Sequence, residues 1–332
     1  MPTDLRIGIL GAARIAPKAV CDPARVVGGV SLAGVAARNR EKAQTFADQH
    51  GIEKAYADYD ELIASPDIDL VYNPLPINLH AEWTIKALEA GKHVLCEKPF
   101  AMNVEEAKAM LAAADKADKR LIEAFHYRYH PAFAVCMDWL NEGRIGDVTR
   151  IDADFSVQIR DTDDEIRQFP ETGGGAMMDL GCYPLSWALH LLGSDLTVVD
   201  AKAETTRRGV DQTLLARLQH GKAWVHLTTS MAQGTPFNAD MTIAGTDGLI
   251  YFKNPLAPHA GSTLSMRRAD GSEVDQLRPI SPISTYTWQL AAIVDALKTG
   301  QPLATEGQVI IDQQAGLDAI YEAAGLRHLR YR

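Results

Sequence analysis

The chain has 332 residues, which at the usual ~150 residues per domain predicts about two domains. Hydrophobic residues make up 46% and charged residues 23%, values typical of a globular protein, so disorder and fibrous repeats are excluded. The 33 Lys and Arg against 43 Asp and Glu leave a net charge of −10. An acidic surface without a basic block argues against nucleic acid as a partner.

Neither a membrane segment nor a disulfide framework is predicted. The four cysteines, Cys21, Cys96, Cys136 and Cys182, are widely spaced and form no Cys-x-x-Cys pair, so we expect reduced thiols and no metal site. No apolar run reaches the ~18 residues of a membrane span. Residues 1–6 lead into a strand pattern rather than the apolar core of a signal peptide. We therefore expect a cytoplasmic protein.

The first part of the chain alternates strand and helix patterns, which is typical of βαβ units on a parallel sheet. One helix pattern follows Asn103, and another runs from Asn78 to Gly91, where a glycine suits the left-handed residue after a helix. Pro23 lies inside the expected first helix, which we predict to be kinked or split there. The predicted strands are Leu5–Leu10, Ser31–Ala36, Asp69–Asn73, His93–Glu97 and Leu121–Phe125.

After about Phe125 successive strand patterns dominate, which predicts an open, largely antiparallel sheet in a second, α+β domain. Helices are predicted at Pro131–Asn141, Ser284–Lys298 and Gly307–Arg327. The change of rhythm places the domains at residues 1–125 and 126–332. The predicted strands are Val148–Ile159, Leu196–Thr206, Thr213–Leu218, Ala223–Met231, Met241–Ala244 and Leu249–Phe252.

A glycine turn directly follows the first strand. Its residues are Gly11, Ala12, Ala13, Arg14, Ile15 and Ala16. They match the Gly-x-Gly-x-x-(Gly/Ala) dinucleotide fingerprint, in which the first glycine makes the turn, the second lets the backbone approach a pyrophosphate and the next helix offers free N–H groups. Ala13 replaces the second glycine, so its Cβ would push the phosphates outward. A plain strand-to-helix turn is the alternative, but the context of strand, turn and opening helix favours a dinucleotide site on the parallel sheet of an α/β domain.

The end of the second strand favours NADP over NAD. An acid at this place would bind the ribose 2′-hydroxyl of NAD, yet the chain continues with Ala37, Arg38, Asn39 and Arg40. Guanidinium groups suit a 2′-phosphate through charge-assisted hydrogen bonds. The alternative is that Arg38 and Arg40 are solvated surface residues.

Two further segments carry candidate reactive groups. Lys98 follows the strand that ends near Glu97, and ligands of open α/β sheets bind outside the carboxyl ends of the strands. Asp179 and Tyr183 are one helical turn apart and face the same way on a helix. The three glycines at 173–175 would let a ligand or a neighbouring backbone approach the start of that helix. Taken alone, each of these residues is better explained structurally: Lys98 as surface, Asp179 as a first-turn acid and Tyr183 as a half-buried aromatic.

Together these motifs resemble the glucose-fructose oxidoreductase/inositol dehydrogenase (Gfo/Idh/MocA) family. The resemblance extends to about Gly193, and beyond it only the pattern matches. The segments that carry it are Ile7–Ala16, Val71–Pro76, Asn78–His80, Ala87–Pro99, Phe125–Pro131 and Gly173–Tyr183.

The resemblance implies a Rossmann domain and an open-sheet domain that binds substrate. It also implies that Lys98, Asp179 and Tyr183 form the catalytic group. Residues matching Pro74, Leu75, Asn78, His80 and Glu97 would line the cofactor, and Tyr127, Arg128 and His130 would lie near the substrate. Tyr183, Ala13 and Arg38 are most similar to the subgroup of NADP-dependent D-xylose and dihydrodiol dehydrogenases.

The resulting hypothesis is hydride transfer between a carbinol carbon of a sugar, polyol or cyclic diol and nicotinamide C4. Two alternatives stay open: an NAD(P)-dependent glycosidase of the same family, and a non-catalytic NADP-binding regulator. The presence of all three catalytic residues disfavours the regulator. Relatives often pair through the open sheet, so we expect a homodimer or homotetramer.

Overall fold

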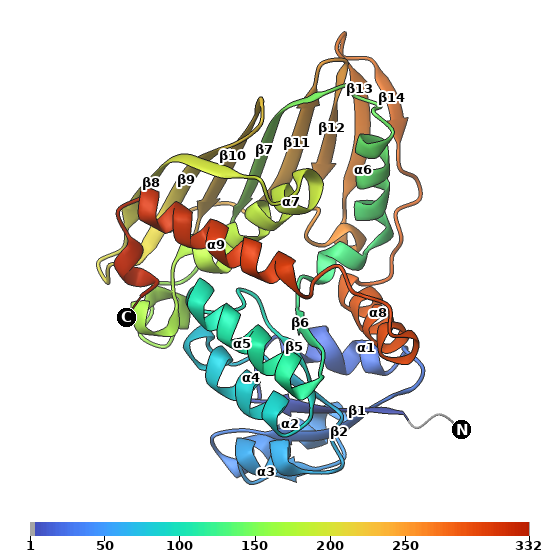
Figure 1. Cartoon of the computed structure of the whole chain (residues 1–332), viewed down its shortest axis with the longest axis vertical. Coiled ribbons are helices and arrows are strands. Elements are labelled where there is room, and N and C mark those ends of the chain that lie inside the picture. Colours follow the sequence, from blue (N-terminus) through green and yellow to red (C-terminus); the bar gives the residue numbers. More distant parts are fainter. Residues whose placement is uncertain (1–3, 332) are drawn as a thin grey trace. The chain divides into compact units, whose positions relative to one another are not determined.

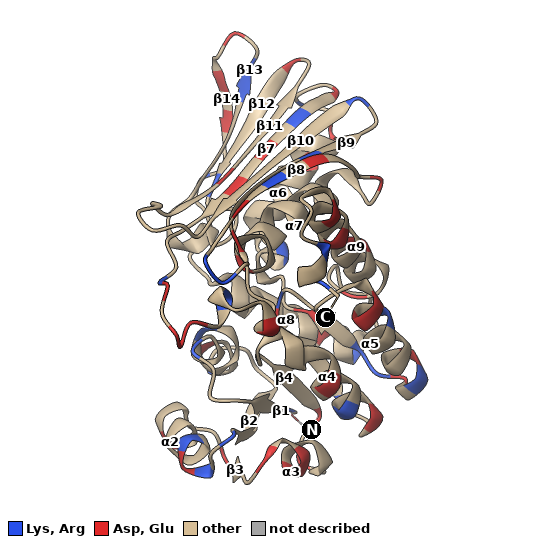
Figure 2. Ribbon diagram, turned by 90° about the vertical axis from the view of Figure 1, so that its left-hand side faces the viewer, with Lys and Arg blue, Asp and Glu red and all other residues tan. Residues whose placement is uncertain are grey.

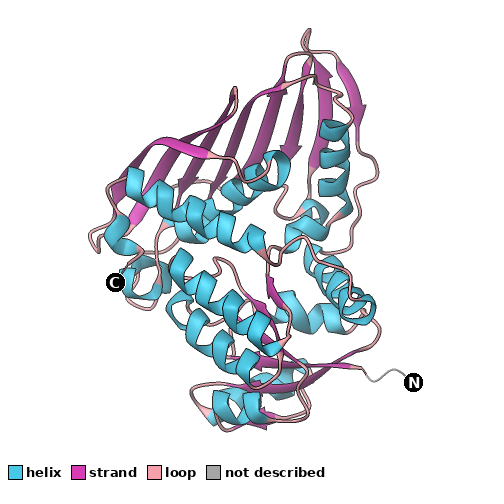
Figure 3. Ribbon diagram, viewed as in Figure 1, coloured by secondary structure: helices cyan, strands magenta, loops and turns pink. Residues whose placement is uncertain are grey.

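The computed structural model describes residues 4–331, which divide into two compact units (Figures 1 and 3). The first unit comprises the described residues up to Ala101 together with Glu105–His126 and Tyr286–Ile310. The second unit comprises Met102–Val104, Tyr127–Thr285 and the described residues from Ile311 onward. No helix in the described part of the chain is both long and apolar enough to cross a membrane.

The first unit contains a six-stranded parallel sheet in the order β3-β2-β1-β4-β5-β6. The strand order reverses between β1 and β4, and such a switch point is where open α/β sheets bind ligands. All five strands predicted for this part are present, and the short β3 is additional. The strands are β1 Leu5–Leu10, β2 Val30–Ala36, β3 Ala55–Tyr56, β4 Leu70–Asn73, β5 His93–Cys96 and β6 Leu121–Glu123.

The first helix is split as the proline predicts. A π-helix, Pro17–Cys21, passes directly into the three-residue helix α1, Asp22–Ala24. Gly91 follows α4 with a φ of 77°, in the left-handed region expected of it. The other helices between β2 and β7 are α2 Arg40–His50, α3 Tyr59–Ala64, α4 His80–Glu89, α5 Val104–Ala117 and α6 Pro131–Asn141, with 3₁₀ turns at Ile77–Leu79 and His126–Tyr129.

Helix α8, Thr285–Thr299, packs in the first unit although the sequence analysis placed residues 126–332 together. Its Leu290, Ile293 and Val294 are buried in one core cluster with residues of β1 and β2. The sequence pattern shows the apolar face of α8 but not the sheet on which that face packs. Residue 125 remains our proposal for where the chain first leaves the Rossmann sheet.

The second unit contains an eight-stranded sheet in the order β14-β13-β12-β11-β7-β10-β9-β8. Only the β7–β10 pair is parallel, so the sheet is largely antiparallel as predicted. Helices α6, α7 (Cys182–Leu192) and α9 (Gln308–Ala323) lie on one of its faces (Figure 1). The strands are β7 Val148–Ser156, β8 Thr197–Thr205, β9 Asp211–His220, β10 Ala223–Ser230, β11 Asn238–Gly245, β12 Gly248–Lys253, β13 Thr263–Arg268 and β14 Glu273–Gln276.

Candidate active site

The dinucleotide turn has the geometry that the glycine motif predicts. Gly11 has a φ of 88°, which a side chain rarely adopts, and its N–H bonds to the carbonyl of Ala36. A Cβ on Gly11 would lie 3.2 Å from Leu75 Cδ2 and 3.8 Å from the Tyr59 hydroxyl. The π-helix after the turn has no side-chain cap; Pro17 has no N–H, and the N–H groups of Ala16 and Ala19 bond to the carbonyls of Ala13 and Ile15. These residues fit a dinucleotide.

Arg38 and Asn39 differ in what their side chains do. Arg38 is exposed beyond the end of β2. The Asn39 side-chain oxygen caps α2, accepting from the N–H groups of Glu41 and Lys42 at 2.8 and 3.2 Å. The Arg38 guanidinium is therefore exposed at this strand end, whereas the Asn39 oxygen is engaged at the start of a helix.

His80 fastens the loop that follows β4. The side chain is buried, with Nε2 2.7 Å from the Leu75 carbonyl and Nδ1 3.2 Å from the Phe100 carbonyl. Burial lowers the pKa of His80 to about 4, so the imidazole is neutral at neutral pH. His80 thus links the loop of Pro74 and Leu75 to the segment that follows Lys98, while Asn78 on the same loop is exposed.

Lys98 lies on a firmly held loop at the end of β5. Glu97 is buried, and its carboxylate accepts from the Tyr72 hydroxyl at 2.7 Å and from the Lys98 N–H at 3.2 Å. Pro99, which follows through a cis peptide bond, and Phe100 are also buried, whereas Lys98 is half-buried. Because β5 neighbours β4, and β4 neighbours β1, this loop lies on the same sheet edge as the Gly11 turn.

A second buried acid, Glu123, occupies the end of the adjacent strand β6. Burial raises the pKa of Glu123 well above its ordinary value, and the nearby Glu97 carboxylate raises it further. The N–H of Phe100 and the charge of Lys98 oppose this only in part. Glu123 was not predicted from the sequence, because a lone acid on a short strand carries no pattern.

Asp179 and Tyr183 lie where a π-helix changes into an α-helix. Met177–Gly181 is π-helical and α7 begins at Cys182, so the expected single α-helix is absent at Asp179. Asp179 is held by Arg167, whose Nε donates to the carboxylate at 2.6 Å. Tyr183 is buried, and its ring lies 5.6 Å from that of Phe155 in an edge-to-face arrangement.

The glycines before this helix admit neighbouring protein groups. A Cβ on Gly174 would lie 2.4 Å from the Arg167 carbonyl oxygen, and one on Gly175 would lie 2.1 Å from Asp211 Oδ1. The buried Asp211 accepts from the Met177 N–H and from the Tyr321 hydroxyl, each at 2.7 Å. Of the two explanations offered for the glycines, close approach of the neighbouring chain is the one these contacts support.

Tyr127 and His130 are engaged inside the second unit. The Tyr127 hydroxyl lies 2.7 Å from Ser186 Oγ and 3.1 Å from His190 Nδ1, which ties it to α7. His130 caps α6 by accepting from the Ala132 N–H at 3.1 Å, and burial lowers its pKa.

Arg128 is different. It is half-buried, its guanidinium lies 5.3 Å from the ring of a phenylalanine on α6, and its Nε is buried without a hydrogen-bond partner in the described structure. An orphaned donor of this kind is a natural group for binding a polar ligand.

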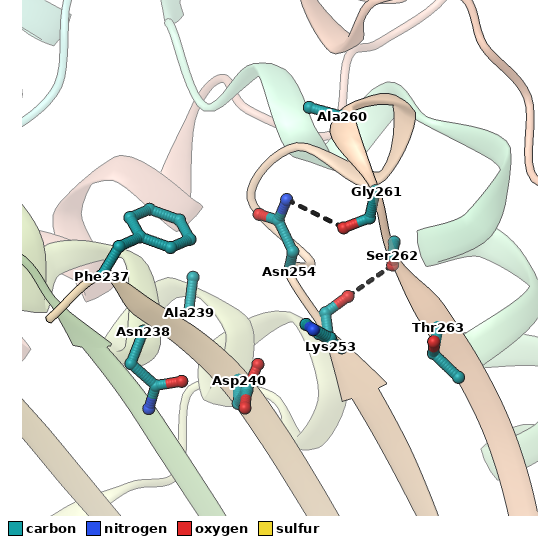
Figure 4. A pocket seen from close by; sticks show the side chains of 10 residues that line it. All are labelled: Phe237, Asn238, Ala239, Asp240, Lys253, Asn254, Ala260, Gly261, Ser262 and Thr263. Atoms are coloured by element: carbon teal, nitrogen blue, oxygen red, sulfur yellow. Dashed lines mark hydrogen bonds between the residues drawn. The ribbon is translucent and has the colours of Figure 1, made fainter.

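One pocket is lined entirely by residues of the second unit. It has a volume of about 510 Å³ and lies beside β11, β12 and β13, as Figure 4 shows. Its lining includes none of the predicted site residues. The lining consists of Phe237, Asn238, Ala239, Asp240, Lys253, Asn254, Ala260, Gly261, Ser262 and Thr263.

Comparison with known proteins identifies the class. Residues 5–125 match an oxidoreductase family with an NAD-binding Rossmann fold, and residues 133–251 match the GFO/IDH/MocA C-terminal domain. The chain therefore belongs to the Gfo/Idh/MocA family of oxidoreductases. The predicted family, two-sheet fold and enzyme class are confirmed.

Particular relatives match two thirds or more of the chain. A D-xylose 1-dehydrogenase (NADP⁺) of Haloferax volcanii is 33% identical over 96% of this chain and 97% of its own. A trans-1,2-dihydrobenzene-1,2-diol dehydrogenase of Xenopus tropicalis is 36% identical over 68% of each. The structure is similar to that of a 3-ketoreductase from Actinomadura kijaniata in complex with NADP and TDP-benzene, with 27% identity, a TM-score of 0.88 and coverage of 97% and 98%.

Proposed function

We propose that this protein is an NADP-dependent oxidoreductase that transfers a hydride between a carbinol carbon of a sugar or cyclic diol and nicotinamide C4. The observation that carries the proposal is that the Gly11 turn and Lys98 both follow the carboxyl ends of strands in the same parallel sheet. Lys98 is half-buried, and the side chains on either side of it are buried. The relatives named as a D-xylose dehydrogenase, a dihydrobenzenediol dehydrogenase and a 3-ketoreductase support the substrate class.

The cofactor supplies a carbon that accepts or returns a hydride when it is bound. In this chain the turn at Gly11–Ile15 would hold the pyrophosphate and Arg38 the 2′-phosphate, with Asn39 beside it. Pro74, Leu75, Asn78, His80 and Glu97 would complete the site, His80 and Glu97 by fixing their loops. NADP is favoured over NAD because an exposed guanidinium, and no carboxylate, follows β2.

Lys98, Tyr183 and Asp179 are proposed to divide the proton chemistry. The Lys98 ammonium stabilises negative charge on the substrate oxygen, and Tyr183 takes the hydroxyl proton during oxidation or returns it during reduction. Asp179, fixed by Arg167, accepts a hydrogen bond from a neighbouring hydroxyl. Arg128 is proposed as a substrate donor, and Tyr127 and His130 are proposed to lie near the substrate while they also hold α7 and α6.

The test is absorbance at the reduced-nicotinamide band with NADP, and separately with NAD, across aldoses, polyols, cyclic diols and their keto forms. Turnover with NADP on a sugar or diol is the expected result. Lys98→Ala and Tyr183→Phe should each lose roughly 10²- to 10⁴-fold in turnover while NADP still binds. Arg38→Ala should weaken NADP but not NAD. Unchanged turnover in either catalytic variant removes that residue from the scheme.

We further propose a cytoplasmic homodimer or homotetramer paired through the exposed face of the eight-stranded sheet. Along β9 and β10 buried and exposed residues alternate, and the exposed set includes Leu215 and Trp224, which are 52% and 37% exposed. Figure 2 shows acidic and basic residues on the sheet, and among them Arg217 of β9 pairs with Asp200 of β8. Apolar side chains interleaved with charges of both signs suit self-association. A monomer by light scattering contradicts this.

A further inference from the structure

A tyrosine that no motif singled out lies against the dinucleotide turn. Tyr59 is the first residue of α3, the helix that follows the short strand β3. The strand β3 is the outermost strand of the six-stranded sheet. Its hydroxyl lies 3.8 Å from the place where a Cβ of Gly11 would stand, so the phenol is next to the residue that makes the tight turn. A group in this position is within reach of whatever the turn binds.

The ring of Tyr59 is fixed by a second aromatic residue. Trp83 on α4 packs against it edge to face, with ring centroids 4.9 Å apart and planes at 80°. Lys86 places its ammonium 4.0 Å from the Trp83 ring centroid and pairs with Asp60, the residue after Tyr59. This packing fixes the phenol with little rotational freedom.

The phenol is a proton donor at neutral pH. Burial raises the pKa of Tyr59, and the nearby Arg38 charge lowers it by less, so the hydroxyl stays protonated. Within residues 4–331 this hydroxyl has no hydrogen-bond partner. By contrast, the hydroxyl of Tyr56, three residues earlier, lies 2.7 Å from Ser65 Oγ.

We propose that Tyr59 donates a hydrogen bond to a pyrophosphate oxygen of the dinucleotide at the Gly11 turn. The inference rests on the proposed function and adds a residue to its cofactor site. It also accounts for Ala13: where a second glycine would let the backbone approach the pyrophosphate, a Cβ keeps the phosphates farther out. A further donor beside the turn then offsets the weaker backbone contact.

The test measures dissociation constants of NADP and NAD by quenching of tryptophan fluorescence, without substrate. Tyr59→Phe should weaken both cofactors roughly 10- to 100-fold, because a hydrogen bond to a charged group is lost. Tyr56→Phe is the matched control and should leave both constants unchanged. The fold of Tyr59→Phe should persist, since the ring stays and the hydroxyl bonds to nothing inside the protein.

The outcomes separate this inference from the proposed function. A wild-type protein that binds neither cofactor refutes the proposed function. If the wild type binds and Tyr59→Phe binds equally well, the inference alone is overturned. A loss confined to NADP also overturns it, because the phenol would then contact the 2′-phosphate rather than the pyrophosphate common to both cofactors.

Discussion

Replacing Arg167 by alanine removes the cation that holds Asp179. The Arg167 Nε donates to Asp179 at 2.6 Å, and Nη1 donates to Glu165 at 2.9 Å. The charge of Asp179, and after it that of Glu165, raises the pKa of Arg167, so the guanidinium is charged at any working pH. A hydrogen bond to a charged group contributes about 1.5–3 kcal/mol. The Arg167 and Asp179 side chains are 39% and 16% exposed, so solvent screening favours the lower part of that range, about 1.5–2 kcal/mol.

If Asp179 positions a substrate hydroxyl, that energy is lost from binding of the transition state. Arg167→Ala should then lower kcat/KM roughly 10- to 30-fold, measured from initial rates, with NADP affinity unchanged. Arg207→Ala is the matched control, because Arg207 is exposed in the same unit and its Nε lies 3.4 Å from Asp161. Wild-type kcat/KM in Arg167→Ala refutes the reasoning. A parallel loss of NADP affinity refutes it as well, since the change would then not be confined to Asp179.

Three further variants test other parts of the molecule. The raised pKa of Glu123 means that the folded state holds one proton more than the unfolded chain above the ordinary carboxyl pKa. Stability should therefore fall as pH rises, by up to about 1.4 kcal/mol per unit, and urea unfolding of Glu123→Gln should lack this slope. Asp211→Asn weakens the acceptor for the Met177 N–H. It should lower turnover while NADP affinity stays intact. Equal losses of turnover and NADP affinity would contradict a role of Asp211 confined to the segment that carries Asp179. Arg120→Ala removes hydrogen bonds to two backbone carbonyls and to Glu306. It should destabilise the first unit by roughly 2–4 kcal/mol, measured by thermal unfolding. An unchanged Tm would show that residues 286–310 do not depend on these bonds.

Periodic patterns predicted the elements that are long and buried on one face. The strand at Leu5–Leu10 and the helix at Pro131–Asn141 have the predicted bounds. The strand β3 has two residues and β14 is polar and half-exposed, so neither gives an alternation that can be read. Helix α8 was found, but its partner sheet is set by a contact across more than 250 residues of chain, which no local pattern encodes.

The candidate site divides in the same way. Motif spacing predicted the Gly11 turn, and the family resemblance implied the roles of Lys98, Asp179 and Tyr183, because both signals depend on neighbours in sequence. Neither found Arg167, Asp211 or Tyr59, because each acts on a residue that is distant in sequence and near only after folding. The glycines at 173–175 were the one available signal, and they indicated a close approach without naming what approaches.

Two of the segments to which the sequence assigned chemistry are π-helical. The 3.6-residue periodicity of an α-helix does not predict this geometry. Within residues 4–331 the π-helical segments are Pro17–Cys21, after the dinucleotide turn, and Met177–Gly181, which carries Asp179. A π-turn is rare because its hydrogen bonding is less favourable, and it persists where surrounding contacts stabilise it. For Met177–Gly181 those contacts are visible: Asp211 binds the Met177 N–H, and a Cβ on Gly181 would lie 2.4 Å from Met177 Sδ. Within residues 4–331 this less favourable helix occurs only in the two segments to which the sequence assigned chemistry, which is the expected result if the geometry is retained for function.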